Sequence, residues 1–201
     1  MKKNISAIVL CLLSVGCETP PVMPHADAPV PTGVIEGTVF YVGSAPECSE
    51  QGEPQGRVIL TLFSYNNPPP PVGSATSALN LYSANADQLF SSTDCGNTAT
   101  IHRSMPFVWP NIPLSAAAGT EVSYQIRGFY DRDEDFNPFF SVRNQPTAGD
   151  VLGGAFVDPS SPTHYAPINF GSRASNELGQ VVRNITVTLG APARTERVIG
   201  F

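Results

Sequence analysis

Apolar and polar residues alternate along several short stretches of the chain, which is the pattern of half-buried β-strands. In the clearest stretch, residues 122–127, polar residues separate the apolar Val122, Tyr124 and Ile126. Residues 181–189 end on the same alternation. Shorter or less regular strands are expected over residues 34–42, 57–65, 79–82, 88–90, 139–142, 149–157 and 195–201. No stretch shows a convincing helical period.

Turn-forming residues separate the expected strands. The 201-residue chain contains 20 Pro and 17 Gly, and only 14% of its residues are charged. Such frequent turn signals favour a β-protein over a helical bundle. About seven to nine short strands joined by turns predict an all-β fold, and more specifically an antiparallel Greek-key β-sandwich.

The N-terminal segment has a different pattern. Lys2 and Lys3 precede a short apolar stretch that ends at Gly16 and Cys17. This stretch is too short to span a bilayer and is typical of a signal peptide. Its end resembles the lipobox of bacterial lipoproteins, although Ser14 stands where that pattern prefers Leu. The resemblance implies cleavage before Cys17 and acylation of that residue; ordinary signal-peptidase cleavage is the alternative.

The chain is therefore expected to have three parts: a signal peptide over residues 1–16, a tether over 17–33 and one β-domain over 34–201. The tether contains five prolines and almost no large apolar residues, so it cannot form a core. Glu18 follows the lipidated cysteine. In the lipoproteins that this segment resembles, Asp at that place favours the inner membrane, so an outer-membrane anchor is expected here.

Cysteine usage agrees with export. Cys48 and Cys95 are the two cysteines that remain once Cys11 leaves with the signal peptide and Cys17 takes lipid. An even pair in an oxidising compartment predicts a disulfide. A metal-binding pair is the alternative, but the two residues lack the C-x-x-C spacing of such sites.

A row of carboxylates follows the strand expected over residues 122–127. Asp131, Asp133 and Asp135 occupy every second position, and Asn137 continues the series. Side chains at this spacing converge if the chain curls into a loop, and carboxylate oxygens suit a hard cation such as Ca²⁺. Asp150 is the candidate for a closing carboxylate, because the glycine before it can turn the chain back. The sequence thus predicts a Ca²⁺ site.

This loop is not an EF-hand. Phe136 holds the place of the turn glycine, and Val142 holds the place of the bidentate glutamate. The alternative to a cation site is a solvated acidic turn, with Arg132 and Arg143 as counter-charges.

Several of these residues together resemble a known family. Gly37 in a first strand, a second strand ending in Phe63, the segment 127–135 and a later Gly149–Asp150 are similar to transthyretin-like (prealbumin-like) domains. The resemblance covers roughly residues 34–190. It implies a seven-stranded Greek-key sandwich of the kind found in bacterial envelope lipoproteins, where it serves as a structural or binding module without catalysis.

Charge and histidine spacing exclude some functions and leave two of different class. The net charge is −6 with no basic patch, so nucleic acid is not an expected partner. His102 and His164 lack the spacing of known metal or catalytic motifs. We therefore expect a non-enzymatic, lipid-anchored envelope module with a Ca²⁺-stabilised loop, whose partner is the membrane and an envelope protein or glycan. The alternative is a hydrolase or ligand-processing domain with a site dispersed over the loops.

Overall fold

The structure is a computed structural model that describes residues 31–66, 78–114, 122–139, 145–171 and 180–192. The signal peptide, most of the tether, Cys17, Arg143 and the strand expected over 195–201 lie outside these residues. The strands are β1 (Thr32–Gly43), β2 (Arg57–Ser64), β3 (Asn80–Asn85), β4 (Ile101–Pro113), β5 (Val122–Asp131), β6 (Val151–Gly154), β7 (Ile168–Phe170) and β8 (Gln180–Pro192). Two short 3₁₀ turns, η2 (Ala86–Gln88) and η3 (Ser92–Asp94), lie between β3 and β4. Within the described ranges, no helix combines the length and hydrophobicity needed to cross a bilayer.

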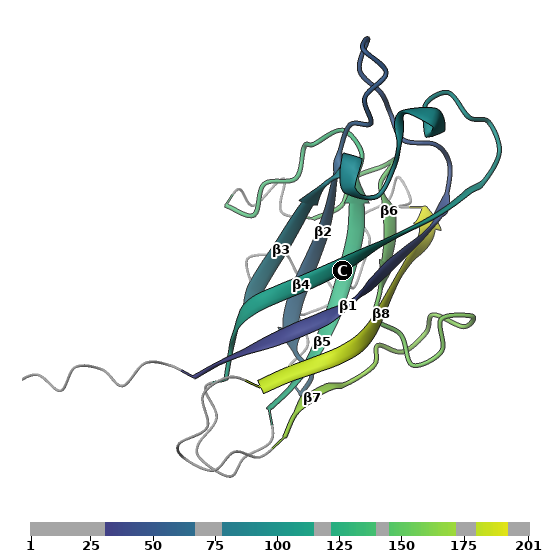
Figure 1. The fold of residues 1–201 in the computed structure, drawn as a ribbon. Coiled ribbons are helices and arrows are strands. Elements are labelled where there is room, and N and C mark those ends of the chain that lie inside the picture. Colours follow the sequence, from purple (N-terminus) through teal and green to yellow (C-terminus); the bar gives the residue numbers. More distant parts are fainter. Residues whose placement is uncertain (1–30, 67–77, 115–121, 140–144, 172–179, 193–201) are drawn as a thin grey trace, which may run out of the picture.

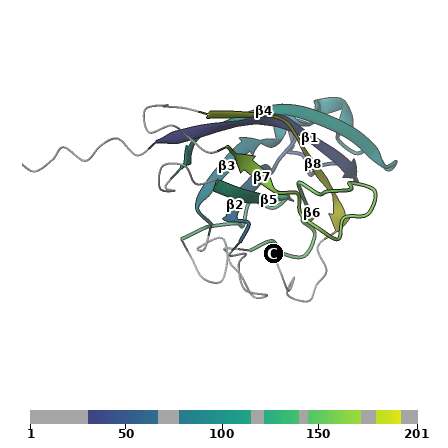
Figure 2. The same ribbon diagram turned by 90° about the horizontal axis from the view of Figure 1, so that it is seen from below.

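The eight strands belong to one sheet, in the order β3-β2-β5-β6-β8-β1-β4, with β7 beside β5. The pair β1–β8 is parallel, and the other pairs are antiparallel. The all-β fold and the predicted number of strands are confirmed. The structure adds that the strands form a continuous mixed sheet, which curls into a nearly closed barrel (Figures 1 and 2).

The two edge strands of the sheet meet across the opening of the barrel. Asn80 of β3 donates a hydrogen bond from Nδ2 to the backbone oxygen of Asn111 in β4, at 3.1 Å. The ring of Tyr82 lies 5.8 Å from that of Phe107 and 6.0 Å from that of Trp109. Side chains therefore close the barrel where backbone pairing stops.

Two segments between β3 and β5 differ from the sequence prediction. Residues 88–90, expected as a strand, belong to the turn that begins with η2, and Leu89 and Phe90 are buried there. β4 is a continuous strand of 13 residues, although Pro106 and Pro110 interrupt its sequence. Proline has no N–H to donate, but an edge strand needs backbone donors on one side only.

Aromatic side chains fill one end of the barrel. Tyr41, Phe90 and Tyr130 pack edge to face or tilted, with ring centroids 4.9–5.8 Å apart. The Tyr41 hydroxyl donates to the Ser44 backbone oxygen at 2.7 Å, and the Tyr130 hydroxyl donates to the backbone oxygen of Gln55. Both hydroxyl groups thus hold the loop between β1 and β2 against the core, as buried tyrosines require.

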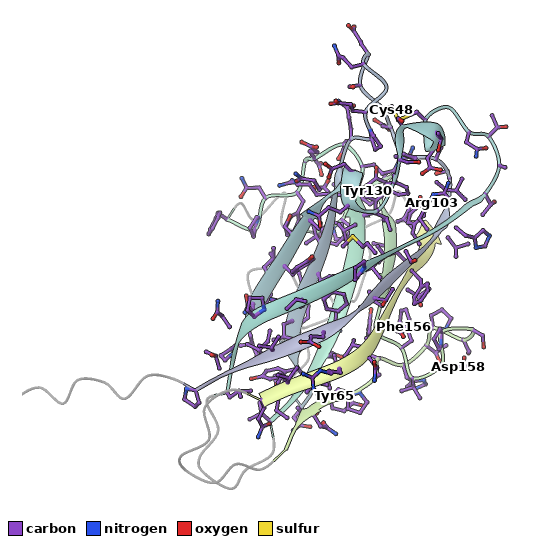
Figure 3. All side chains as sticks on the ribbon, viewed as in Figure 1. Cys48, Tyr65, Arg103, Tyr130, Phe156 and Asp158 are labelled. Carbon is purple, nitrogen blue, oxygen red and sulfur yellow. A yellow bond between two sulfur atoms is a disulfide. The ribbon has the colours of Figure 1, made fainter. Side chains whose placement is uncertain are left out.

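The loop between β1 and β2 is also held by a disulfide. Cys48 in this loop is bonded to Cys95, which directly follows η3, and the two Cα atoms are 5.9 Å apart. This distance lies in the ordinary range for disulfides. The predicted pairing is confirmed, and it joins two loops at one end of the barrel (Figure 3).

A second, smaller apolar cluster lies on the outer face of the sheet. Ile59 of β2 and Phe129 of β5 are opposite each other in the strand pairing, and both are buried. Phe136, in the loop after β5, completes this cluster with its ring 5.0 Å from that of Phe129. The contact anchors the acidic loop against the outside of the barrel.

Candidate cation site in the loop after strand β5

The strand register brings the first and last of the predicted carboxylates together. β5 ends at Asp131, which lies opposite Arg57 of β2. On the other side of β5, Tyr130 pairs with Val151, the first residue of β6. One step further along this antiparallel register, Asp150 lies beside Asp131. Residues 19 positions apart in the chain therefore meet because their strands are neighbours.

The loop between these strands returns Asp135 to the same place. Phe136 is fixed against Phe129, so the residue before it stays close to the end of β5. Gly149 has φ +106°, a left-handed conformation that glycine adopts without strain, and it turns the chain into Asp150. The glycine singled out in the sequence thus has the expected local role.

Three of the five predicted ligands converge. One carboxylate oxygen from each of Asp131, Asp135 and Asp150 lies within 4.8 Å of the other two. Ca²⁺ binds oxygen at about 2.3–2.6 Å, so two ligands of one ion can be at most about 5 Å apart. The three oxygens therefore fit around a single Ca²⁺ ion.

The other two predicted ligands serve the loop itself. Asp133 is exposed, and its Oδ1 accepts a hydrogen bond from the backbone N–H of Asp135 at 3.3 Å. The side-chain oxygen of Asn137 accepts one from the N–H of Phe139 at 3.0 Å. Asp133 and Asn137 stay outside the converging group, and both stabilise turns of the backbone beside it.

Hydrogen bonds orient the three carboxylates. Asp150 accepts one from the backbone N–H of Arg132 at 3.1 Å and one from that of Thr147 at 2.7 Å. The hydroxyl of Thr147 also donates to Asp135 Oδ1 at 3.3 Å. Asp131 Oδ2 accepts from Arg57 Nη2 at 2.8 Å, whereas its Oδ1 is buried and has no hydrogen-bond partner among the described residues.

Burial makes this arrangement electrostatically unfavourable without a cation. Asp131 and Asp150 are almost completely buried, with 0% and 1% of their surface exposed. Burial raises the pKa of Asp131 against the opposing effect of Arg57, and it raises the pKa of Asp150 to about 6. The neighbouring Asp131 and Asp133 contribute to this rise in the pKa of Asp150, and the hydrogen bonds from Thr147 and Arg132 oppose it. A bound cation reverses both effects, because it favours the ionised form of each carboxyl group.

Arg57 is the counter-charge that the sequence analysis missed. It lies 74 residues before Asp131 in the chain, and only the pairing of β2 with β5 shows that the two residues meet. Arg132 was a counter-charge only in the alternative of a solvated acidic turn. Its side chain donates to the backbone oxygen of Ala45 at 3.2 Å and lies 3.9 Å from Glu47. It therefore ties the acidic loop to the disulfide-bonded loop.

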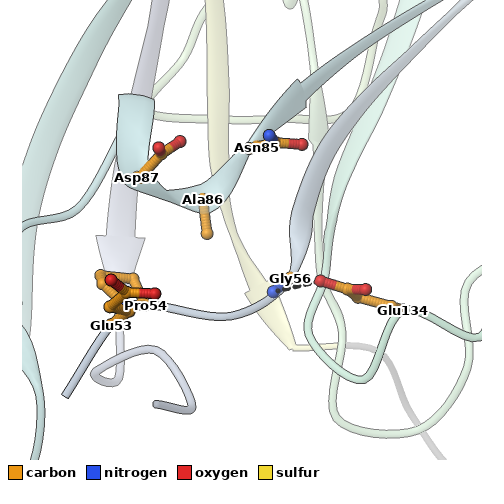
Figure 4. A pocket seen from close by; sticks show the side chains of 7 residues that line it. All are labelled: Glu53, Pro54, Gly56, Asn85, Ala86, Asp87 and Glu134. Carbon is orange, nitrogen blue, oxygen red and sulfur yellow. Dashed lines mark hydrogen bonds between the residues drawn. The ribbon is translucent and has the colours of Figure 1, made fainter. Parts of the chain in front are cut away.

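An open hollow of about 370 Å³ lies next to this site. Glu134, from the acidic loop, borders it and accepts a hydrogen bond from the Gly56 N–H at 3.1 Å. The residues that line it are Glu53, Pro54, Gly56, Asn85, Ala86, Asp87 and Glu134 (Figure 4). The two histidines of the domain lie elsewhere: His102 is exposed on β4, and the ring of His164 lies 2.9 Å from the Thr163 hydroxyl.

Comparisons with known proteins identify no family for this chain. No protein-family model matches the sequence, and no curated protein matches it. Among solved structures, a fimbrial assembly protein from Parabacteroides distasonis ATCC 8503 is similar, with a TM-score of 0.34 and 6% sequence identity. The similarity covers 79% of this chain and 53% of that chain, so this chain spans about half the length of that protein.

Proposed function

We propose that this chain is a lipid-anchored protein of the bacterial outer membrane and resembles the transthyretin-like envelope lipoproteins. Its β-domain is a structural or binding module rather than an enzyme, and its partner is an envelope protein or a glycan. Ca²⁺ bound by Asp131, Asp135 and Asp150 stabilises the loop after β5. Residues 17–31, the part of the predicted tether that precedes β1, hold the domain away from the lipid surface.

The observation that carries the cation site is the environment of Asp131. Its side chain is completely buried, and its Oδ1 has no hydrogen-bond partner among the described residues. Leaving such an atom unpaired costs free energy comparable to a lost hydrogen bond, about 1–3 kcal/mol or more for a charged group. A cation shared with Asp135 and Asp150 removes that cost, and it supplies a reason for three acids to converge in a partly buried place.

Export is supported from two directions. The segment ending at Gly16–Cys17 has the pattern of a lipoprotein signal, and it lies outside the described residues. Independently, Cys48 and Cys95 form a disulfide within the domain, and such bonds persist in oxidising compartments.

A thermal-shift titration with Ca²⁺ tests the cation site. Extracellular Ca²⁺ modules bind in the range of about 10⁻⁴–10⁻³ M, so the titration should reach roughly 10 mM. At about ten times the Kd, mass action adds roughly 1.4 kcal/mol, which raises the melting temperature by roughly 3–6 °C. Asp135→Asn and Asp150→Asn should abolish this rise, whereas Asp133→Asn, the matched control, should keep it. An equal response in Asp150→Asn contradicts the site.

Mass spectrometry of the N-terminal peptide tests the anchor. We expect acyl chains on Cys17 as the first residue of the mature protein. Cys17→Ser should move the protein from the membrane fraction to the soluble fraction. An unmodified Cys17 in the mature protein, or cleavage at another position, contradicts the anchor.

A further inference from the structure

The guanidinium group of Arg57 holds the same loop that carries the proposed cation ligands. Its Nη2 donates to Asp131 Oδ2 at 2.8 Å, to the backbone oxygen of Phe136 at 3.1 Å and to that of Glu134 at 3.4 Å. One nitrogen thus gathers a carboxylate and two backbone carbonyl groups from residues 131–136. About a third of the Arg57 side chain is exposed, so its charge lies at the rim of the site.

These three acceptors are the kinds of oxygen that bind Ca²⁺ in proteins, namely carboxylate and backbone carbonyl oxygens. From this we infer that Arg57 is a built-in substitute for part of the cation. It gathers the loop when no cation is bound, and its positive charge weakens the binding of Ca²⁺ at Asp131, Asp135 and Asp150. This inference rests on the proposed function, because it assigns the residue that sets the affinity of the proposed site.

The geometry indicates which effect of Arg57 is larger. A Ca²⁺ ion bound to Asp131 Oδ1 would lie within roughly 7 Å of the Arg57 nitrogen, given Ca–O distances of about 2.4 Å. At that distance the single positive charge of Arg57 repels the double charge of Ca²⁺. This repulsion corresponds to more than a tenfold decrease in the Ca²⁺ binding constant, even at an effective dielectric constant of about 20. Removing Arg57 also removes its hydrogen bonds to the loop. This effect weakens Ca²⁺ binding, because a less ordered loop binds the ion less tightly. Asp150 and Thr147 are hydrogen-bonded to each other without Arg57, so much of the site stays ordered.

Three substitutions separate the charge of Arg57 from its hydrogen bonds. Arg57→Gln and Arg57→Met remove the charge, and the unbranched Met side chain fills similar space. Arg57→Lys keeps the charge but lacks the planar arrangement of donors. Calorimetric titration with CaCl₂ should give a Kd at least about fivefold lower for the two neutral variants than for Arg57→Lys and the native chain. The neutral variants should also melt at a lower temperature in EDTA and gain more from each millimolar of Ca²⁺.

The possible outcomes separate this inference from the function on which it rests. If the native chain binds Ca²⁺ and the neutral variants bind it no more tightly than Arg57→Lys, the role of Arg57 is wrong and the cation site stands. If neither the native chain nor the neutral variants bind Ca²⁺, the cation site itself is wrong. Neutral variants that stay unfolded even in 10 mM CaCl₂ also contradict the inference, because the cation should then replace the lost charge.

Discussion

The buried carboxylate of Asp94 accepts hydrogen bonds from both Nε and Nη2 of Arg103, at the start of β4. The Nε–Oδ2 distance is 2.9 Å, and Oδ2 also accepts the N–H of Ser91, the residue before η3, at 2.9 Å. Asp94 directly precedes Cys95, so this pair fixes the disulfide-bonded segment to an edge of the sheet (Figure 3). The hydrogen bonds from Arg103 hold the pKa of Asp94 below its ordinary value, against the opposing effect of burial.

The Asp94–Arg103 pair should make stability depend on pH in acid. Because the pKa of Asp94 is lower in the folded state, the pair stabilises the fold fully above the unfolded pKa of about 3.9. That contribution is lost as the pH falls through the folded pKa. Asp94→Asn should therefore be less stable than the native chain at pH 7, by a margin that shrinks below about pH 4. Urea unfolding from pH 7 to pH 2 measures this, and a constant margin contradicts it.

Asp150 should have the opposite effect in the absence of a cation. Its pKa is raised to about 6 by burial, so the folded state binds this proton more tightly than the unfolded state does. In EDTA, its contribution to stability is full below about pH 4 and is lost as the pH rises through about 6. Asp150→Asn should lack this slope in urea unfolding at pH 4–7. If the same dependence of stability on pH persists in the variant, another titrating group causes it.

The Cys48–Cys95 disulfide should contribute strongly to stability. The bonded residues are 47 positions apart, and the chain-entropy model gives about 4 kcal/mol for a loop of that length. The double variant Cys48→Ala/Cys95→Ala should lose that amount in urea unfolding. Dithiothreitol should lower the melting temperature of the native chain and leave that of the double variant unchanged, which serves as the control.

Gly153 should be intolerant of any side chain. A Cβ atom at this position in β6 would lie 1.8 Å from the backbone oxygen of Thr188 in β8, and a strand backbone cannot move away without breaking its pairing. Overpacking of this kind costs roughly 1–3 kcal/mol or more. Gly153→Ala should therefore lower the melting temperature by about 4–8 °C. At Gly171 no atom lies within 4 Å of the added Cβ, so Gly171→Ala should be nearly neutral.

Patterns of apolar and polar residues predicted the parts of the fold that depend on residues close together in the chain. The alternation over residues 122–127 lies within β5, and that over 181–189 lies within β8. In β5 the polar Gln125 and Arg127 are buried as well, so the alternation predicted the strand but not the burial of both its faces. β4 was not predicted, because Pro106 and Pro110 indicate a break in a strand unless that strand is known to lie at an edge of its sheet. Residues 88–90 were expected as a strand because Leu89 and Phe90 are apolar. Buried residues give this same pattern in a turn and in a strand.

The candidate site was predictable only in its local part. Asp131 and Asp135 were identified by their spacing, and Asp150 by the glycine before it. Arg57 was missed, since its contact with Asp131 depends on the register of β2 and β5, which spacing along the chain does not encode. The same limit applies to Asp133, whose side chain accepts a backbone N–H of its own turn. Which member of an acidic row points inward is decided by the folded loop.

The edge position of β4 has a consequence for copies of this protein that meet at high concentration. Pro106, opposite Thr38 of β1, has no N–H and so offers no donor to a further strand. The backbone oxygen of His102 in the same strand already accepts a hydrogen bond from Nη1 of Arg103 at 2.8 Å. These two positions interrupt the row of backbone groups with which a second copy could pair. Crowding should therefore not lead copies to associate through this edge of the sheet.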